Sequence, residues 1–299
     1  MSKQQRLAVA EIYRHLPFTI AGDPATQRVA MEAALTAIPL PGDVTTTPGA
    51  LGGVPVLTVD VAGADSSKVL VHFHGGVYVL GSALSGAGLA VDLGRQAGVR
   101  AISVDYRLAP EHPYPAAIDD ALAVYRAVLE QIPNSQIALS GESAGGGLVV
   151  ALLLRLKELG LPLPASSVTL SPWVDLTLSG QSMSSKASID PSVLTPEGLR
   201  IRVPDYLGGM DPATPDISPI FADLSGLPPM LIQVGSHEIL LDDAVRLAAQ
   251  AAAHDVEVTL QVTPEVSHVF QAFAAVLDEG ERALREAGAF LRTHFEEKK

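Results

Sequence analysis

The sequence contains no cysteine, so disulfides, thiolate metal sites and a cysteine nucleophile are all excluded. It also lacks a long hydrophobic run. The longest uninterrupted apolar stretch, Ala144 to Leu154, is about half of the roughly 20 residues that a membrane helix needs. The first residues, MSKQQRLAVAEIYRHLP, contain no long apolar core and no cleavage site, so we expect no signal peptide. We therefore expect a cytoplasmic protein with no membrane partner.

Basic residues are scarce. The chain has 20 Lys and Arg against 33 Asp and Glu, which gives a net charge of −13. This balance argues against a nucleic-acid partner, because phosphate binding needs a basic field. The composition is 47% apolar and 18% charged, which excludes a disordered chain, and 299 residues are enough for one large core.

Apolar, β-branched runs alternate with helical patterns through most of the chain. This alternation predicts an α/β fold with a mostly parallel sheet that is covered by helices on both faces. The expected strands are Val54–Val61, Lys68–Phe73, Arg100–Asp105, Gln136–Leu139, Ser166–Leu170, Met230–Val234 and Val256–Val262. The expected helices are Ala116–Glu130, Ala144–Leu159, Asp242–Ala253 and Glu279–Phe290.

Two segments depart from this alternation. In the first, about residues 1–45, an apolar stripe precedes a second helix that starts at Asp23-Pro24, an acceptor side chain followed by a proline. The second, about residues 179–219, is rich in Ser, Pro and Asp, and a short helix is expected from Thr195. Irregular insertions of this length are usually functional. We expect both segments to form a helical cap on a single domain that covers residues 1–299.

A candidate nucleophile lies where an expected strand meets an expected helix. The residues there read Gly141-Glu142-Ser143-Ala144-Gly145. Gly-x-Ser-x-Gly at such a corner puts the serine in a strained turn with its hydroxyl exposed above the sheet. The glycines are needed because a Cβ at either position would strike the neighbouring strand or helix. The alternative is a glycine-rich turn in which Ser143 only caps the helix.

Candidate oxyanion donors follow the strand that ends at Phe73. Acyl transfer places negative charge on the former carbonyl oxygen, and backbone amides can stabilise it. Gly75 and Gly76, with the amide of Ala144, fit this role, although two glycines after a strand can also form a simple turn. His72 and His74 share one strand face, so a metal site is conceivable, but no third ligand is evident and we assign none.

Three sequence blocks make the chain resemble the hormone-sensitive-lipase-like family of α/β-hydrolase esterases. They are His74-Gly75-Gly76, the run from Asp105 to Ala117, and Gly141 to Gly146. The resemblance implies an α/β-hydrolase fold, a cap that includes the N-terminal helices, short-chain acyl esters as substrates and a homodimer as one oligomeric state. The family's third glycine is Val77 here. The family assigns the first two glycines as donors, so the oxyanion hole is expected to survive, with Val77 and Tyr78 as candidates for substrate contact.

A serine nucleophile needs a base that is oriented by an acid, and hydrolases of this fold carry them in the order Ser, Asp or Glu, His. His268 follows the last expected strand, where the family places its base. The family's Asp-x-Leu-x-Asp pattern, aligned on Leu240, makes Glu238 the acid and Asp242 the alternative. The remaining residues considered are placed in a loop or on the surface: His237, Asp243, His254 and His294.

These assignments predict a carboxylesterase that works through an acyl-enzyme on Ser143, without a metal or organic cofactor. One alternative is the same machinery acting on an amide, a formamide or a lactone. The other is a non-catalytic α/β-hydrolase binding protein, which usually lacks one of the three catalytic residues. Because the base must be neutral, activity is expected to fall in acid.

Overall fold

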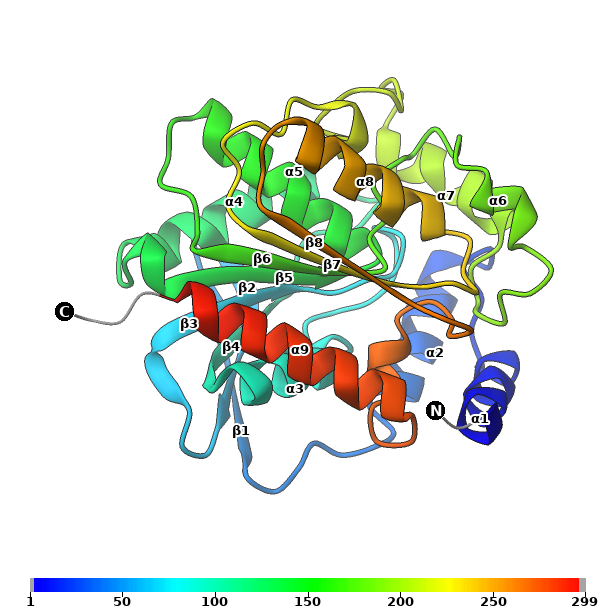
Figure 1. The fold of residues 1–299 in the computed structure, drawn as a ribbon, viewed down its shortest axis with the longest axis horizontal. Coiled ribbons are helices and arrows are strands. Elements are labelled where there is room, and N and C mark those ends of the chain that lie inside the picture. Colours follow the sequence, from blue (N-terminus) through cyan, green and yellow to red (C-terminus); the bar gives the residue numbers. More distant parts are fainter. Residues whose placement is uncertain (1–2, 296–299) are drawn as a thin grey trace.

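The computed structural model describes residues 3–295. Residues 1–2, at the start of the predicted cap, and residues 296–299 lie outside the described part. The described residues form an eight-stranded sheet in the order β1-β2-β4-β3-β5-β6-β7-β8 (Figure 1). The strands are β1 (Val44–Leu51), β2 (Val54–Val61), β3 (Asp65–Phe73), β4 (Val99–Val104), β5 (Ile137–Glu142), β6 (Ser166–Leu170), β7 (Met230–Gly235) and β8 (Val258–Thr263).

The sheet is mostly parallel. β1 and β2 pair antiparallel, β2 pairs antiparallel with β4, and all pairings from β4 to β8 are parallel. Helices α3 (Ala87–Ala97) and α9 (Asp278–His294) pack on one face. Helices α4 (Ala116–Leu129), α5 (Ala144–Glu158) and α8 (Leu241–Ala253) cover the other face (Figure 1). The predicted fold class is therefore confirmed, and the carboxyl ends of the parallel strands share one edge of the sheet.

Strand β1 and helix α3 were not predicted from the sequence. β1 contains three threonines, a proline and a glycine, and its residues are exposed or half-buried. An exposed edge strand carries no apolar alternation, so its sequence resembles a loop. α3 contains two glycines, which are unfavourable in helices. Glycine is needed at position 94 because the Cβ of any other residue would lie only 3.1 Å from the backbone oxygen of Val99.

Both irregular segments lie at the end of the sheet where the parallel strands finish (Figure 1). The first contains α1 (Lys3–Arg14) and α2 (Pro24–Leu35), and Asp23 caps α2 as its sequence indicates. The second contains α6 (Ser182–Ser185) and α7 (Pro196–Leu207), and Thr195 caps α7. Short 3-10 helices occur at Asn134–Gln136, Pro219–Phe221 and Phe270–Phe273.

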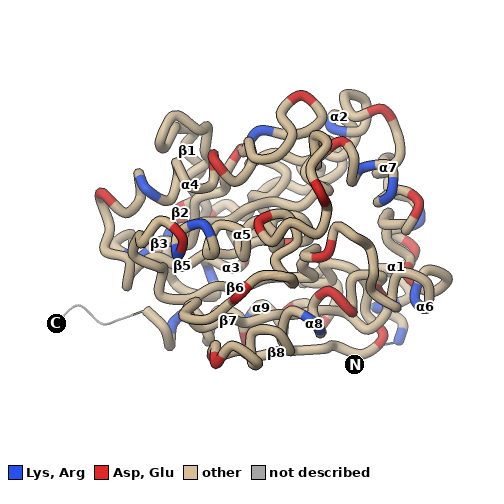
Figure 2. The backbone as a smooth tube through the Cα atoms, turned by 90° about the horizontal axis from the view of Figure 1, so that it is seen from above, with Lys and Arg blue, Asp and Glu red and all other residues tan. Residues whose placement is uncertain are grey.

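Arginine side chains hold the two segments to each other and to the turn after β3. Arg202 on α7 donates from Nε to the oxygen of Ile20, at 2.5 Å. Arg28 on α2 donates to the oxygen of Val79, at 2.7 Å. Figure 2 shows that the basic positions of α1, α2 and α7 alternate with acidic ones at this end.

Among the described residues, no helix has both the length and the apolar character to cross a membrane.

Asp243 is a core residue, so its placement on the surface from the sequence is wrong. Its side chain is 0% exposed, and Oδ2 accepts the amides of Val174 and Asp175, both at 2.9 Å. Asp175 in turn accepts from Thr177, Ser179 and Arg246. Asp243 thus anchors the chain that leaves β6 toward the second irregular segment.

Burial raises the pKa of Asp243 from 3.8 to about 8, and the charge of Asp175 acts in the same direction. The folded protein therefore holds a proton here that the unfolded chain loses near its ordinary pKa. The stability due to this proton is present in acid and is lost as the pH rises through about 8.

We expect Asp243→Asn to remove this pH dependence, because its amide resembles the protonated carboxyl and keeps an acceptor for both backbone amides. Between pH 5 and pH 8, the free energy of unfolding of the wild type should fall relative to the variant by up to about 1.4 kcal/mol per pH unit. Urea unfolding of both proteins at several pH values measures this. Parallel curves for the two proteins would contradict the assignment.

Candidate active site

Ser143 occupies a strained turn between β5 and α5. Its φ is 55° and its ψ is −121°, a conformation that residues with a side chain rarely adopt. A Cβ on Gly141 would lie 2.3 Å from the oxygen of Gly145, and a Cβ on Gly145 would lie 2.0 Å from the oxygen of Phe73. Both glycines are therefore required for the reason that the sequence suggested, and the turn packs directly against the end of β3.

His268 and Glu238 form a hydrogen-bonded pair on two later loops. His268 Nδ1 lies 2.7 Å from Glu238 Oε2, and the carboxylate is 0% exposed. The other oxygen, Oε1, accepts the hydroxyl of Ser171 at 2.8 Å and the amide of Gly235 at 2.6 Å. A carboxylate that accepts three hydrogen bonds is held in one orientation, and it fixes the ring that it contacts.

Asp242, the alternative acid, has a different partner. Its Oδ2 accepts the amide of Ser182 at 2.9 Å, which ties α8 to the second irregular segment. Of the two acids, Glu238 is the one that contacts His268. His254 and His294 each hydrogen-bond the backbone of their own helix, and both are only partly exposed.

The loop after β6 connects Ser143 to this pair. The amide of Ser143 donates to Leu170, and Trp173 donates to the oxygen of Ser143, both at 2.9 Å. Between them, Ser171 donates to Glu238 and accepts the amide of Val269 at 3.0 Å. The loop from Leu170 to Trp173 thus contacts the candidate nucleophile at both of its ends and the acid–histidine loops between them, through Ser171.

The glycine turn after β3 lies against Ser143, but Gly75 differs from its predicted role. Its amide donates to Glu142 Oε1 at 2.7 Å, so this donor already has a partner. Within residues 3–295, the amides of Gly76, Val77 and Ala144 have no hydrogen-bond partner. The sequence could not reveal this, because the choice depends on which amide the side chain of Glu142 reaches.

Val77 and Tyr78 are both buried, and both have a positive φ. The ring of Tyr78 stacks on Tyr206 of α7, with 3.9 Å between the ring centroids. The turn after β3, which contains these two residues, is therefore packed against the second irregular segment.

His72 and His74 have partners within the protein. His72 Nδ1 lies 2.9 Å from the hydroxyl of Ser140, while His74 Nδ1 lies 2.7 Å from the oxygen of Gly75. His74 also stacks on Tyr106, and burial lowers its pKa. Over residues 3–295, no group of three or more His, Asp or Glu side chains is arranged to hold a metal ion.

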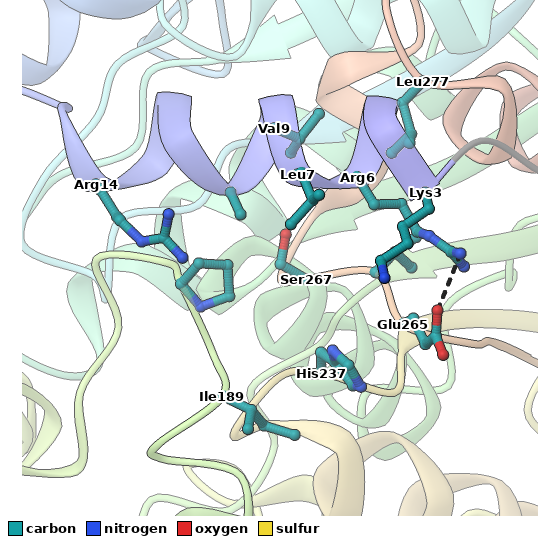
Figure 3. Close-up of a pocket in the computed structure, with 13 residues that line it drawn as sticks. Lys3, Arg6, Leu7, Val9, Arg14, Ile189, His237, Glu265, Ser267 and Leu277 are labelled. Carbon is teal, nitrogen blue, oxygen red and sulfur yellow. Dashed lines mark ion pairs between the residues drawn. The ribbon is translucent and has the colours of Figure 1, made fainter.

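A cavity of about 230 Å³ lies under α1, beside the acid–histidine pair (Figure 3). Its lining includes His237, which precedes Glu238, and Ser267, which precedes His268. Arg6 reaches across it to Glu265 at 2.9 Å. Neither Ser143 nor Tyr78 borders this cavity. It therefore adjoins the loops that carry the pair rather than the candidate nucleophile.

A parallel sheet with a serine in the turn after its central strand, and an acid and a histidine on the loops after β7 and β8, is the arrangement of an α/β hydrolase. A family model for the alpha/beta hydrolase fold matches residues 70–272. An acetyl-hydrolase of Streptomyces hygroscopicus is 44% identical over 254 residues, which cover 85% of this chain and 83% of the relative. An esterase of Acinetobacter venetianus is 41% identical over 231 residues, which cover 77% of this chain and 76% of the relative.

Comparison with solved structures identifies the group of α/β hydrolases that this chain resembles. An esterase from the bacterial hormone-sensitive lipase family superposes with a TM-score of 0.95 at 40% identity, covering 99% of this chain and 100% of that one. EstE5, in a crystal soaked with p-nitrophenyl butyrate, superposes with a TM-score of 0.93 at 36% identity, covering 98% and 99%. The chain belongs to the α/β-hydrolase family and, within it, to the hormone-sensitive-lipase-like esterases.

We expect Gly145→Ala to destabilise the fold by about 3 kcal/mol or more, because the new Cβ meets backbone that cannot move independently. Gly88→Ala is the matched control. It also adds one methyl group at a helical glycine, but no atom lies within 4 Å of the new Cβ. It should stabilise the protein by about 0.5–1 kcal/mol. Urea unfolding measures both, and equal effects would disprove the packing argument.

Proposed function

We propose that this protein hydrolyses short-chain acyl esters through an acyl-enzyme on Ser143, with His268 as the base and Glu238 as the acid of the triad. The contact that carries the proposal is the 2.7 Å hydrogen bond between His268 and the buried carboxylate of Glu238. A base that is oriented by an acid and can reach the serine hydroxyl is the general requirement of serine acyl transfer.

In the proposed reaction, His268 Nε2 removes the proton from Ser143 as the hydroxyl oxygen attacks the ester carbonyl. Glu238 accepts from Nδ1, so it orients the ring and stabilises its charge once the ring is protonated. The tetrahedral intermediate collapses when the ester C–O bond breaks and His268 gives the proton to the departing alcohol. Water, deprotonated by the same ring, then hydrolyses the acyl-enzyme.

The oxyanion donors are the amides of Gly76, Val77 and Ala144. Gly76 and Ala144 are the donors already expected from the sequence, and in this proposal Val77 replaces Gly75 because the amide of Gly75 already donates to Glu142. A donor aimed at developing negative charge typically contributes a factor of about 10²–10³ to the rate. A valine can serve as well as a glycine here, because the donor is a backbone group.

The substrate range in this proposal rests on the relatives and on the two irregular segments. The similar Streptomyces protein is called an acetyl-hydrolase, which favours a small acyl group. The segments containing α1, α2, α6 and α7 act as a cap over a single domain and bound the pocket. The proposal includes a small-molecule ester as the partner and a cytoplasmic location.

The alternatives differ from this proposal in ways that can be measured. An amidase, a formamidase or a lactonase would use the same three residues, so only a panel of substrates separates them. A non-catalytic binding protein would not react with an organophosphate, whereas an activated serine becomes labelled.

We expect the wild type to hydrolyse p-nitrophenyl acetate and butyrate, and its kcat/KM to fall steeply toward the palmitate because the cap limits the length of the acyl group. Ser143→Ala is the control, and it should lower kcat by several orders of magnitude with an unchanged melting temperature. A wild-type kcat in Ser143→Ala would disprove the assignment of Ser143 as the nucleophile. A rate that rises toward the palmitate would disprove the short-chain preference.

The two acids should separate clearly. Glu238→Gln removes the charge beside the ring and is expected to lower kcat by about 10³-fold or more. Asp242→Asn removes a charge four residues away, which contacts Ser182 rather than His268, so kcat should stay within about threefold of the wild type. Steady-state kinetics with p-nitrophenyl acetate compares them. A larger loss of kcat in Asp242→Asn than in Glu238→Gln would make Asp242 the acid of the triad.

A further inference from the structure

A buried group of a hydroxyl, an imidazole and a carboxylate lies next to the candidate nucleophile. His72 on β3 is paired in register with Ser140 on β5, and its Nδ1 lies 2.9 Å from the serine hydroxyl. Its Nε2 lies 2.9 Å from Oε2 of Glu142, the residue before Ser143. All three residues are buried.

Each part of this group faces a suitable partner when the proton of His72 is on Nε2. The hydroxyl of Ser140 then donates to Nδ1, and the proton on Nε2 faces the carboxylate. Nε2 and Oε2 are close, but they are not aligned for a linear hydrogen bond, so the contact is mainly electrostatic. The remaining oxygen, Oε1, is free to accept the amide of Gly75, which it does at 2.7 Å.

The amide of Gly75 marks the start of the strained turn. A Cβ on Gly75 would lie 3.1 Å from Cβ of Ser143, so the turn is in direct contact with the nucleophile. The next two residues have positive φ values, 115° at Gly76 and 53° at Val77. A valine in this conformation is strained, and it persists only where neighbouring contacts hold it.

We propose that Ser140, His72 and Glu142 act as a positioning relay that holds the Gly75 amide and thereby directs the amides of Gly76 and Val77 at the oxyanion. This inference rests on the proposed function. The three residues do not touch the substrate. They act through the turn, and their effect is largest in the transition state, where negative charge has developed.

The first test is Glu142→Ala, which removes the acceptor for Gly75. With p-nitrophenyl acetate, kcat should fall about 10–100-fold while KM stays within about twofold, because the ground-state ester carries little negative charge. Affinity for an alkyl boronic acid, which forms a tetrahedral adduct with the serine, should fall by a similar factor. A variant with a lower melting temperature but wild-type kcat and boronate affinity would overturn the proposal.

Glu142→Gln is the conservative rescue. Its amide oxygen can still accept from Gly75, and its amide nitrogen can donate to His72 in the other tautomer. We expect it to recover most of the kcat and boronate affinity that Glu142→Ala loses. A loss in Glu142→Gln as large as in Glu142→Ala would show that the acceptor for Gly75 is not what matters.

Ser103 provides a matched control. It is a buried serine on β4, paired with His72 from the other side, and its hydroxyl donates to the oxygen of Ala83. Ser140→Ala should lower kcat several-fold and Ser103→Ala should not, although each removes one buried hydroxyl beside the same histidine. Equal kinetic effects of the two variants would overturn the relay.

Organophosphate labelling separates a failure of this inference from a failure of the proposed function. If the wild type is neither labelled nor active on esters, the proposed function itself is wrong. If the wild type is labelled at Ser143 and Glu142→Ala is labelled at the same rate, the function stands and the relay is disproved. Slower labelling of Glu142→Ala alone supports the relay.

Discussion

The close approach of the β5–α5 turn to the end of β3 is the constraint on which the rest of the site depends. Gly145 lies so near β3 that no side chain fits between them, and Gly141 closes the turn from the other side. Ser143 can keep its positive φ because the surrounding backbone leaves it no alternative. The same approach brings the Gly75 turn against the serine, so the candidate nucleophile and the candidate oxyanion donors belong to one packed unit.

The acid–histidine pair depends instead on side-chain hydrogen bonds between loops. Glu238 is held by Ser171 from the loop after β6 and by Gly235 at the end of its own strand. The side chain of glutamate is longer than that of aspartate. It reaches Ser171 and Gly235 with one oxygen and leaves the other oxygen for His268. Buried charge of this kind is stable only where its partners are complete, so the geometry of the pair is sensitive to each of the loops.

Prediction from the sequence succeeded where the local pattern has one physical meaning. The buried strands and the Gly-x-Ser-x-Gly corner belong to this group. Runs of apolar residues identify the strands, and the two glycines identify a turn too tight for other side chains. It failed at β1, which is held by its pairing with β2, and at α3, which packs on α9 and β4. It also failed at Asp243, whose burial depends on amides about 70 residues away. The partner of the Gly75 amide was equally hidden, since it is set by the reach of one side chain.

Both irregular segments are hydrogen-bonded to the loops that carry the acid–histidine pair. The hydroxyl of Tyr13 on α1 donates to the backbone oxygen of His268, and burial raises the pKa of this tyrosine well above its usual range, so it stays a donor. Asp190 accepts the amide of Ile239, next to Glu238, at 2.9 Å. A movement of α1 away from this loop therefore removes a hydrogen bond from the backbone of His268. The positions of the two irregular segments and of the acid–histidine pair are therefore energetically coupled.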